Sequence, residues 1–289
     1  MLNGFLLIDK EENMTSYDVI RKIKRLLKEH SIQTKIGHTG TLDPFATGLL
    51  IVLFGKYTRL SDYFMQLSKR YEGEFVQGFT TDTGDYTGKV VEAFPLISQD
   101  KIKEKTHLFL GKSLQIPPAY SAVKHNGKKL YEYARKGIVI TKAPREIEVF
   151  DFNVSLSDQE RYSFSMCVSS GTYVRTVIED YMKSLGGGAY ISSLRRTSSG
   201  NLHSEDALSI SKLDSSTMMS RIQKISDDIL PYPVVEITDV ERQSLIHGIQ
   251  IKNNGNPEEA IWLKHNNEYF ALAKRHNNQL FTKLFLVEV

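Results

Sequence analysis

Cysteine is almost missing from this chain, and that absence limits what the protein can be. Cys167 is the only cysteine among 289 residues, so the chain can form no internal disulfide and no zinc site built from several cysteines. Long apolar runs are missing too, since no stretch approaches the roughly 20 apolar residues that a membrane span requires. The N-terminal segment MLNGFLLIDKEE reaches charged residues too soon for a secretory signal. These absences predict a cytoplasmic protein without a membrane partner.

Motifs of several common enzyme classes are also absent. The sequence contains no Gly-x-x-x-x-Gly-Lys-Ser/Thr phosphate loop, no Gly-x-Gly-x-x-Gly turn after a strand and no Gly-x-Ser-x-Gly nucleophile elbow. A single cysteine cannot supply the Pro-Cys-x-x-Cys half of a zinc deaminase site. We therefore expect a protein that uses no cofactor and no metal ion.

Positive charge is concentrated in two segments, although the formal net charge is only +3. Residues 19–36 carry six cations and one acid, and residues 111–150 carry eight cations and three acids. The second segment interleaves tyrosines with its cations, which suits RNA because bases stack on aromatic rings while Lys and Arg hold phosphates. The first segment is equally compatible with the solvent face of a helix. We predict RNA contacts for Lys124, Lys128, Lys129 and Arg135.

Hydrophobic periodicity and turn residues predict a mixture of helices and strands. A helix over residues 16–30, with Ser16 as its N-cap, would bury one apolar face. Residues 49–54 form a short apolar run that predicts a buried strand. The remaining expectations are a turn-rich segment at 37–48, strands at 71–80, 89–93 and 162–169, helices at 98–110 and 172–185, a loop-rich stretch at 111–145, and short strands after 230.

The segment GHTGTLDPFATGLL, residues 37–50, places three glycines, a proline and one carboxylate in front of that buried strand. Glycine permits sharp turns and the close approach of a ligand, and Pro44 keeps Asp43 out of the helical region. An Asp-Pro pair alone is more typical of an ordinary turn. The complete string of residues instead favours a functional role for Asp43.

This string resembles the signature of the TruB family, the bacterial tRNA pseudouridine-55 synthases. The family pattern is Gly-His-x-Gly-x-Leu-Asp-Pro-x-Ala-x-Gly-x-Leu, and residues 37–50 fill every fixed position. The resemblance covers most of residues 5–200 and weakens beyond them. Further similar segments follow in the family's order: SKRYEGEF at 68–75, TDTGD at 81–85, PPAYSAVKHNGKKLYEYARKG at 117–137, SGTYVRT at 170–176 and GGGAYISSLRRT at 186–197.

The resemblance implies a reaction and a role for single residues. Uracil would leave C1′ of its ribose, rotate and rejoin through C5, after the nucleotide has been flipped out of its stack. Asp43 would be the catalytic carboxylate, which either attacks a carbon or stabilises charge and moves a proton. Arg175 would pair with it, because a guanidinium favours an ionised carboxylate, and Asp85 would contact Arg175. The remaining contacts implied for the flipped uridine and its surroundings are His38, Tyr71, Tyr173 and Leu194.

One segment departs from the family pattern. Near its N-terminus the family usually has Lys-Pro-x-Gly-x-Thr-Ser, whereas residues 10–16 here read Lys-Glu-Glu-Asn-Met-Thr-Ser. Loss of the proline and the glycine leaves the geometry of this turn open. The catalytic segment itself is complete.

The resemblance also implies an architecture and a substrate. We expect an α+β protein with the pseudouridine synthase fold, in which a mixed, largely antiparallel sheet is flanked by helices and loops. Residues 1–230 would form the catalytic domain, with a basic RNA-binding insertion at 111–145, and residues 231–289 would form a small β-rich, PUA-like domain. The implied substrate is uridine-55 in the T-arm of tRNA, and we expect a monomer that needs no protein partner.

Two other functions fit parts of the sequence. TGTLD, residues 39–43, is similar to the aspartate turn of phosphoryl-transfer enzymes, but it lacks the nucleophile that precedes this turn in those enzymes. A non-catalytic RNA-binding protein would explain the basic segments but not the Asp43 turn. From the pattern alone, Tyr71 could equally face a core and Arg175 could lie on the surface of a helix.

Overall fold

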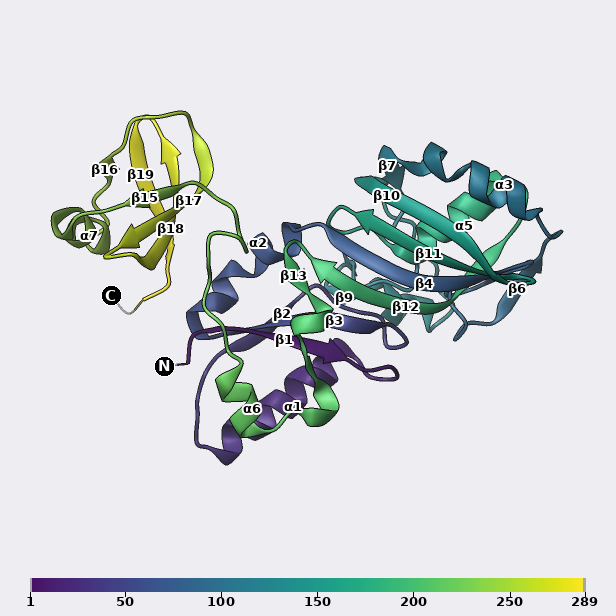
Figure 1. Cartoon of the computed structure of the whole chain (residues 1–289), viewed down its shortest axis with the longest axis horizontal. Coiled ribbons are helices and arrows are strands. Elements are labelled where there is room, and N and C mark those ends of the chain that lie inside the picture. The colour runs from purple at the N-terminus through teal and green to yellow at the C-terminus, as the bar shows by residue number, and fades with distance from the viewer. Residues whose placement is uncertain (1, 288–289) are drawn as a thin grey trace.

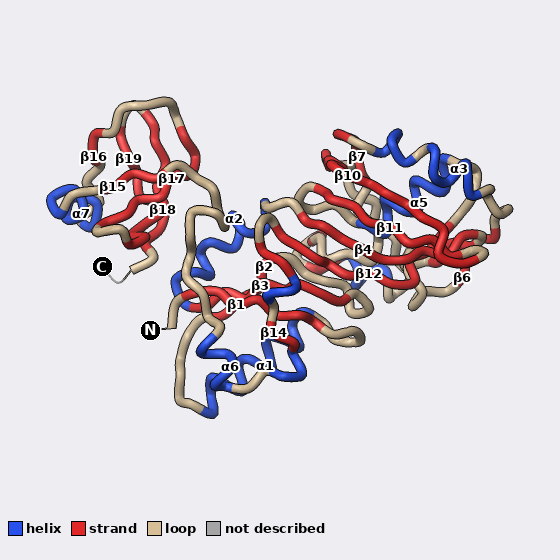
Figure 2. The backbone as a smooth tube through the Cα atoms, in the orientation of Figure 1, coloured by secondary structure: helices blue, strands red, loops and turns tan. Residues whose placement is uncertain are grey.

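The computed structural model describes residues 2–287 and consists of one large sheet with helices around it and a second, smaller sheet (Figure 1). The tube in Figure 2 shows how far strands dominate both parts. The strands of the large sheet are β1 (Gly4–Lys10), β2 (Ile36–Thr39), β3 (Thr47–Phe54), β4 (Lys69–Gln77), β7 (Gly111–Gln115), β10 (Arg145–Asp158), β11 (Arg161–Val168), β12 (Ala189–Ser199), β13 (Leu202–His203) and β14 (Leu208–Ser209).

The large sheet is mixed and largely antiparallel, as predicted. Its order is β14-β1-β3-β12-β4-β11-β10-β7, with β2 beside β3 and β13 beside β12. Only the pairs β1–β14 and β3–β12 are parallel. Two small hairpins lie outside this sheet: β5 (Phe79–Thr81) with β6 (Val90–Ala93), and β8 (Lys124–His125) with β9 (Lys128–Lys129). The α+β expectation is therefore confirmed.

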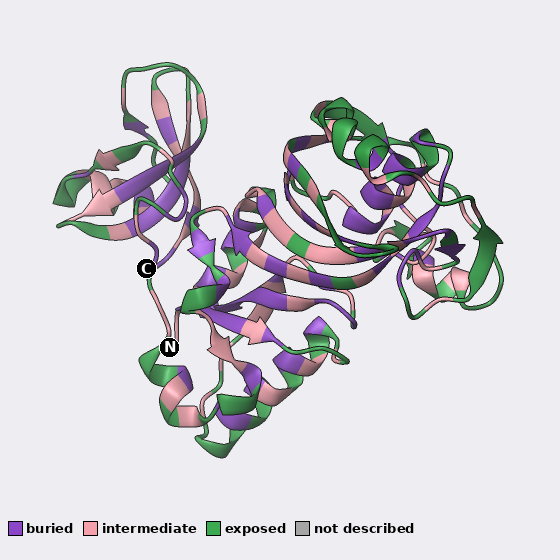
Figure 3. Cartoon of the chain, turned by 45° about the vertical axis from the view of Figure 1, so that its right-hand side comes forward, coloured by how far each residue is buried: buried purple, intermediate pink, exposed green. Residues whose placement is uncertain are grey.

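Strands β1 and β3 are buried on both faces, which explains the continuous apolar run at residues 49–54. Leu50 and Val52 pack into the larger core, and Leu49 and Ile51 pack into a second cluster on the opposite face. The strands near the other end of the sheet instead alternate between buried and accessible residues (Figure 3). An unbroken apolar run is what burial on both faces of a sheet requires.

Helices cover the large sheet at two places, with α1 and α6 at one end and α3 and α5 at the other (Figure 1). The predicted N-cap of the first helix is wrong by one residue, because Thr15 caps α1 in a capping box with Asp18. The helices are α1 (Ser16–Glu29), α2 (Ser61–Gln66), α3 (Gln99–Glu104), α4 (Leu130–Ala134), α5 (Val174–Ser184), α6 (Ser215–Ser220) and α7 (Asp239–Ile246).

The smaller sheet has the order β15-β17-β18-β19-β16 and forms a compact unit with α7. Its inner side has a core of its own, and its other side contributes Trp262, Leu272 and Leu284 to the cluster that covers β1 and β3. The indole Nε1 of Trp262 donates to the carbonyl of Leu230 at 2.9 Å. The strands are β15 (Val234–Glu236), β16 (Ile251–Lys252), β17 (Glu258–His265), β18 (Glu268–His276) and β19 (Gln279–Phe285).

Several elements differ from the sequence prediction. The segment 37–48 was expected to be turns, but β2 covers its first part because it pairs with β3 from Ile36 to Thr39. Residues 111–115 were expected to be loop and form an edge strand paired with β10. The strands β1, β10 and β12 and the helix α7 were not predicted. The expected strand near the C-terminus is present as far as Phe285, and its last two residues, 288–289, lie outside the described part of the chain.

No helix within residues 2–287 has both the length and the apolar character needed to span a membrane.

Candidate active site

The loop that carries Asp43 connects β2 to β3, and three side chains from other elements hold its backbone. Ser16, the first residue of α1, accepts a hydrogen bond from the Leu42 N–H at 2.9 Å and donates to the Leu42 carbonyl at 3.3 Å. The Lys10 ammonium donates to the Pro44 carbonyl at 3.3 Å. The Arg196 guanidinium donates to the Gly40 carbonyl at 3.2 Å. The loop backbone is therefore held at Gly40 and Leu42, which precede Asp43, and at Pro44, which follows it.

Arg196 on β12 also brings the catalytic loop close to the centre of the sheet. Its Nε donates to the Leu49 carbonyl at 2.7 Å, and its side chain is only 3% exposed. The parallel contact between β12 and β3 occurs at Gly48, where a Cβ atom would lie 2.3 Å from the Arg196 carbonyl. Gly48 also has φ +98°, so any side chain there would be strained as well as blocked. Arg196 therefore supports the loop rather than an RNA phosphate.

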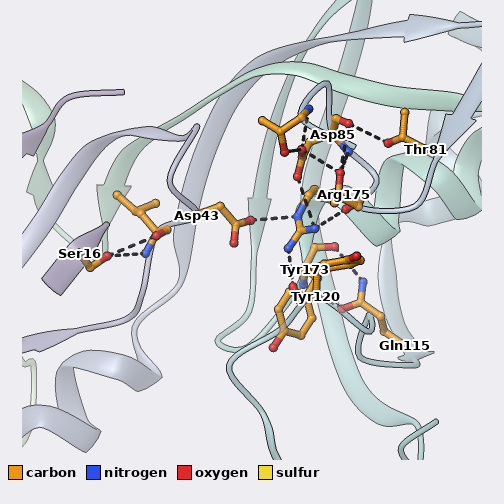
Figure 4. Close-up of polar contacts among 11 residues, drawn as sticks. Ser16, Asp43, Thr81, Asp85, Gln115, Tyr120, Tyr173 and Arg175 are labelled. Carbon is orange, nitrogen blue, oxygen red and sulfur yellow. Dashed lines mark hydrogen bonds and ion pairs between the residues drawn. The ribbon is translucent and has the colours of Figure 1, made fainter. Parts of the chain in front are cut away.

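Arg175 lies at the centre of the site, and all of its guanidinium nitrogens are engaged (Figure 4). Nε is 2.9 Å from Asp43 Oδ2, and Nη1 is 3.5 Å from Asp85 Oδ2. Nη2 donates to the Tyr120 carbonyl at 2.9 Å, and Nη1 also donates to the Thr83 carbonyl. The Asp43–Arg175 pair that the resemblance implied is thus present, and so is the contact of Arg175 with Asp85.

Burial controls the ionisation of Asp43. Crowding by protein atoms raises the pKa of Asp43 above its usual value, and the Asp85 carboxylate pushes it in the same direction. Arg175 and Lys10 oppose that shift. The side chain nevertheless keeps 36% of its surface accessible, through the mouth of a cleft. The carboxylate is therefore poorly hydrated yet reachable, a combination typical of catalytic groups.

Lys10 and Lys69 are two buried lysines near this carboxylate. Burial lowers the pKa of each to about 8. Both ammonium groups are nonetheless satisfied by backbone carbonyls: Lys10 by Glu11, Met14 and Pro44, and Lys69 by Met65 and Leu67. Neither lysine was predicted as a site residue, because their carbonyl partners come from loop geometry that the sequence does not show.

The N-terminal turn that departs from the family pattern is closed by contacts of its own. Asn13 stands where the family has glycine, and its φ is +61°. Asparagine is one of the few non-glycine residues that tolerate this left-handed conformation. Lys10 closes the turn through the Glu11 and Met14 carbonyls. The turn therefore still delivers Ser16 to the catalytic loop.

A cleft of about 320 Å³ opens beside Asp43. This volume lies within the range of small-ligand sites. Five of the predicted residues line the cleft: Asp43, Tyr71, Tyr173, Arg175 and Leu194. Residues that the sequence did not single out also line it, among them Lys69, Ser121 and Arg145, and so does Arg196 of the GGGAYISSLRRT segment.

His38 and Asp85 do not line this cleft. Asp85 is 4% exposed and lies behind Arg175, where it accepts hydrogen bonds from Thr83 Oγ1 at 2.9 Å and from the Thr87 N–H at 3.0 Å. Its direct partner is thus Arg175 rather than a ligand in the cleft. His38 lies on β2 with its Nδ1 buried and without a hydrogen-bond partner in the described chain, and burial lowers its pKa.

The predicted RNA-binding cations lie on the β8–β9 hairpin and on or just after α4. Lys124, Lys128 and Arg135 are exposed. Lys129 and Arg135 both lie over the ring of Tyr131, at 5.6 and 5.3 Å from its centroid. The same segment supplies Ser121 to the cleft. A positively charged arm is therefore continuous with the wall of the candidate active site.

A larger hollow of about 560 Å³ lies beside this cleft and shares Leu194 with it. Glu72 and Glu74 line the hollow, and they alternate along β4 with Tyr71, which faces the catalytic cleft. Its acidic lining would repel a polyanion. The smaller cleft, which holds the Asp43–Arg175 pair, is the better candidate for an RNA site. Within residues 2–287, no three His, Cys, Asp or Glu side chains gather in a way that could hold a metal ion.

Comparison with known proteins agrees with this geometry. The model of the TruB family pseudouridylate synthase N-terminal domain matches residues 24–174. A tRNA pseudouridine synthase B of Clostridium kluyveri is 38% identical over 253 residues, covering 87% of this chain and 86% of that protein. The chain belongs to the TruB family. It is therefore a pseudouridine synthase, an isomerase.

Other relatives and solved structures extend the comparison. A tRNA pseudouridine synthase B of Streptococcus thermophilus is 38% identical, covering 88% of this TruB-family chain and 89% of that protein. A chain from the structure of an H/ACA RNP bound to a substrate RNA containing 2′-deoxyuridine matches with a TM-score of 0.73 at 21% identity, covering 99% of this chain and 85% of that one. One from a Cbf5–Nop10–Gar1 complex matches with a TM-score of 0.74 at 23% identity, covering 98% and 85%. These structures share the fold.

Proposed function

We propose that this protein converts uridine-55 in the T-arm of tRNA to pseudouridine, with Asp43 as the catalytic residue. The observation that carries the proposal is the Asp43 carboxylate, which faces a cleft while Arg175 holds one of its oxygens at 2.9 Å. The relatives named tRNA pseudouridine synthase B support tRNA as the substrate. The complete catalytic string at residues 37–50 supports the same reaction.

In the proposed reaction the bond between N1 of uracil and C1′ of the ribose breaks, and a bond between C5 and C1′ forms. The proton on C5 leaves to solvent, and N1 gains a proton, so atoms and charge balance without an external oxidant or reductant. Asp43 either attacks a carbon covalently or stabilises the positive charge that develops on the sugar and moves the proton. Arg175 keeps the carboxylate ionised and aimed into the cleft.

The residues around Asp43 would hold the flipped nucleotide and exclude water. Tyr71 would stack on the uracil, and Tyr173 and Leu194 would form the walls of its pocket. A dry pocket matters because a detached uracil must stay near the sugar until it has turned. His38 would contact RNA beside the flipped base, and Asp85 would act through Arg175.

RNA outside the cleft would be held mainly by charge. The cations of the β8–β9 hairpin and α4 would contact phosphates of the T-arm, with Tyr120 and Tyr133 available for bases. The smaller sheet would act as a PUA-like RNA-binding domain, with residues 1–230 as the catalytic domain. We expect the enzyme to work as a monomer in the cytoplasm.

The test is tritium release from tRNA labelled with 5-³H-uridine, followed by mapping of pseudouridine in the product. Release of tritium together with a single new pseudouridine at position 55 is the expected result. Pseudouridine at another position would change the substrate assignment but not the chemistry. Binding without any release would mean that the protein only holds RNA.

A further inference from the structure

One guanidinium in the catalytic cleft has no acceptor for its hydrogen bonds among the residues that the structure describes. Arg145, the first residue of β10, lines the cleft that contains Asp43. Its Nε is buried and has no hydrogen-bond partner in residues 2–287, and no ion pair there involves its side chain. A buried N–H group without an acceptor is costly, and more so when it carries part of a charge. Such a charge beside an active site indicates that an anionic group pairs with it in the working complex.

The other cations that line the cleft are occupied by the protein itself. Arg175 is held by two carboxylates and two carbonyls. Arg196 donates to one carbonyl of the catalytic loop and to one of β3, and Lys69 donates to the carbonyls of Met65 and Leu67. In the described chain, Arg145 is therefore the one cation of this cleft to which no protein oxygen is hydrogen-bonded.

The position of Arg145 is fixed even though its donors are free. Its guanidinium lies over the ring of Tyr173, 4.6 Å from the centroid, which is a cation–π contact. Gly171 packs against the same group: a Cβ atom at Gly171 would lie 3.4 Å from the guanidinium carbon. Stacking of this kind leaves the in-plane N–H groups free, and those groups are the ones that bind phosphate bidentately.

We propose that Arg145, assisted by the Ser121 hydroxyl, binds a backbone phosphate of the RNA next to the flipped uridine. Ser121 Oγ is buried, lacks a partner in the described residues and lines the same cleft. This phosphate subsite rests on the proposed function, because it requires RNA in the cleft. Lys124 and Lys128 of the basic hairpin are exposed, whereas Arg145 is half-buried and lines the cleft that contains Asp43.

A purely structural role for Arg145 predicts different behaviour. If the guanidinium served only to hold the Tyr173 ring, its loss would slow the chemical step and leave RNA affinity unchanged. If it binds phosphate, its loss weakens binding and removes one ionic contact. The two roles therefore separate in Kd, in the salt dependence of Kd and in the single-turnover rate at saturating RNA.

The first experiment measures binding and single-turnover kinetics of a T-arm stem-loop RNA with the full-length chain. Arg145→Gln should raise Kd about tenfold, as expected for loss of a charge-assisted hydrogen bond. The slope of log Kd against log salt should fall by about 0.7–0.9, the contribution of one phosphate. Arg145→Lys, which keeps the charge, should restore most of the slope. Arg161→Gln removes an exposed guanidinium paired with Glu74 on β4 and serves as the matched control.

The second experiment replaces single phosphates around the target uridine by uncharged methylphosphonates. One replacement should weaken binding to the wild-type protein and have no further effect on binding to Arg145→Gln, because both changes remove the same contact. Equal effects of every replacement on both proteins would overturn the proposal. So would an Arg145→Gln variant with unchanged Kd and salt slope, which would leave the proposed function standing if the wild type still releases tritium. A wild type that neither binds nor modifies the RNA would remove both proposals.

Discussion

The side chain of Gln115 holds both backbone polar groups of Tyr173. Its Oε1 accepts from the Tyr173 N–H at 2.8 Å, and its Nε2 donates to the Tyr173 carbonyl at 3.0 Å. Gln115 is 2% exposed and ends the edge strand β7, opposite Arg145 on β10. Tyr173 is the N-cap residue of α5, two residues before Arg175. The edge of the sheet therefore sets where α5 begins and, through it, where the guanidinium meets Asp43.

Gln115→Leu should lower the single-turnover rate by roughly 10²-fold, because small displacements of catalytic groups have effects of that size. The Tyr173 N–H would lose its acceptor, whereas the Tyr173 carbonyl keeps the Val177 N–H at 3.1 Å. The free energy of unfolding should therefore fall by about 2 kcal/mol. Denaturant unfolding and single-turnover kinetics measure the two effects. Gln159→Leu, at an exposed turn, is the control. A rate within twofold of wild type would show that Gln115 does not position Arg175.

Asp43→Asn should abolish turnover while leaving tRNA affinity within about tenfold, because phosphate contacts dominate binding. Tritium release and a filter-binding measurement test the two halves of this prediction. Asp100→Asn changes an exposed carboxylate at the start of α3 and should behave as wild type. Retained turnover in Asp43→Asn would mean that another group carries out the chemistry.

Arg175→Gln should slow the reaction by orders of magnitude and move its acidic limit to higher pH. The pKa of Asp43 already lies above its ordinary value of 3.8 because of burial, and Arg175 opposes that rise. Without the guanidinium, the pKa of Asp43 rises further. Since the ionised carboxylate is the active form, activity is lost as pH falls through that pKa. The single-turnover rate measured against pH should therefore show a higher midpoint in the variant than in the wild type, and an unmoved midpoint would mean that another group sets this limit.

The double charge reversal Lys128→Glu with Lys129→Glu should weaken tRNA binding and flatten its salt dependence. Both lysines belong to β9 in the hairpin beside the cleft. The same reversal at Lys101 and Lys103 on α3 is the matched control, since it changes the net charge equally. If both double variants lose affinity to the same extent, net charge rather than the hairpin drives binding.

The parts of the site that are built from residues close together in the sequence could be predicted. Asp43 and its turn could be recognised because the glycines and the proline that shape the turn lie within the same short segment. The helix that carries Arg175 was predicted from its own apolar spacing. The substitution at Asn13 could not be judged from the sequence, and the structure shows that asparagine adopts the φ that the family's glycine would supply.

The supporting contacts could not be predicted, because their partners are far apart along the chain. Gln115 meets Tyr173 across 58 residues, and Arg196 meets Leu49 across 147. The segment that forms β12 was recognised from its family-like motif but was not predicted to be a strand. It is the strand that joins the two halves of the sheet. Arg145 belongs to no motif in the sequence. It was identified because its guanidinium lines the cleft and its Nε has no acceptor in the described residues. Only the packed structure shows that Arg145 Nε is buried without an acceptor in the described residues.

The packing around Trp262 ties the smaller sheet to strands β1 and β3 of the large sheet. The indole and its neighbours on the smaller sheet share one apolar cluster with the outer side of β1 and β3, together with Tyr57, Leu60 and Phe64. A chain cut near residue 230 would remove Trp262, Leu272 and Leu284 from this cluster and leave its remaining members on β1 and β3 less well covered. The appendage and the enzyme should therefore melt together, and neither is a detachable module.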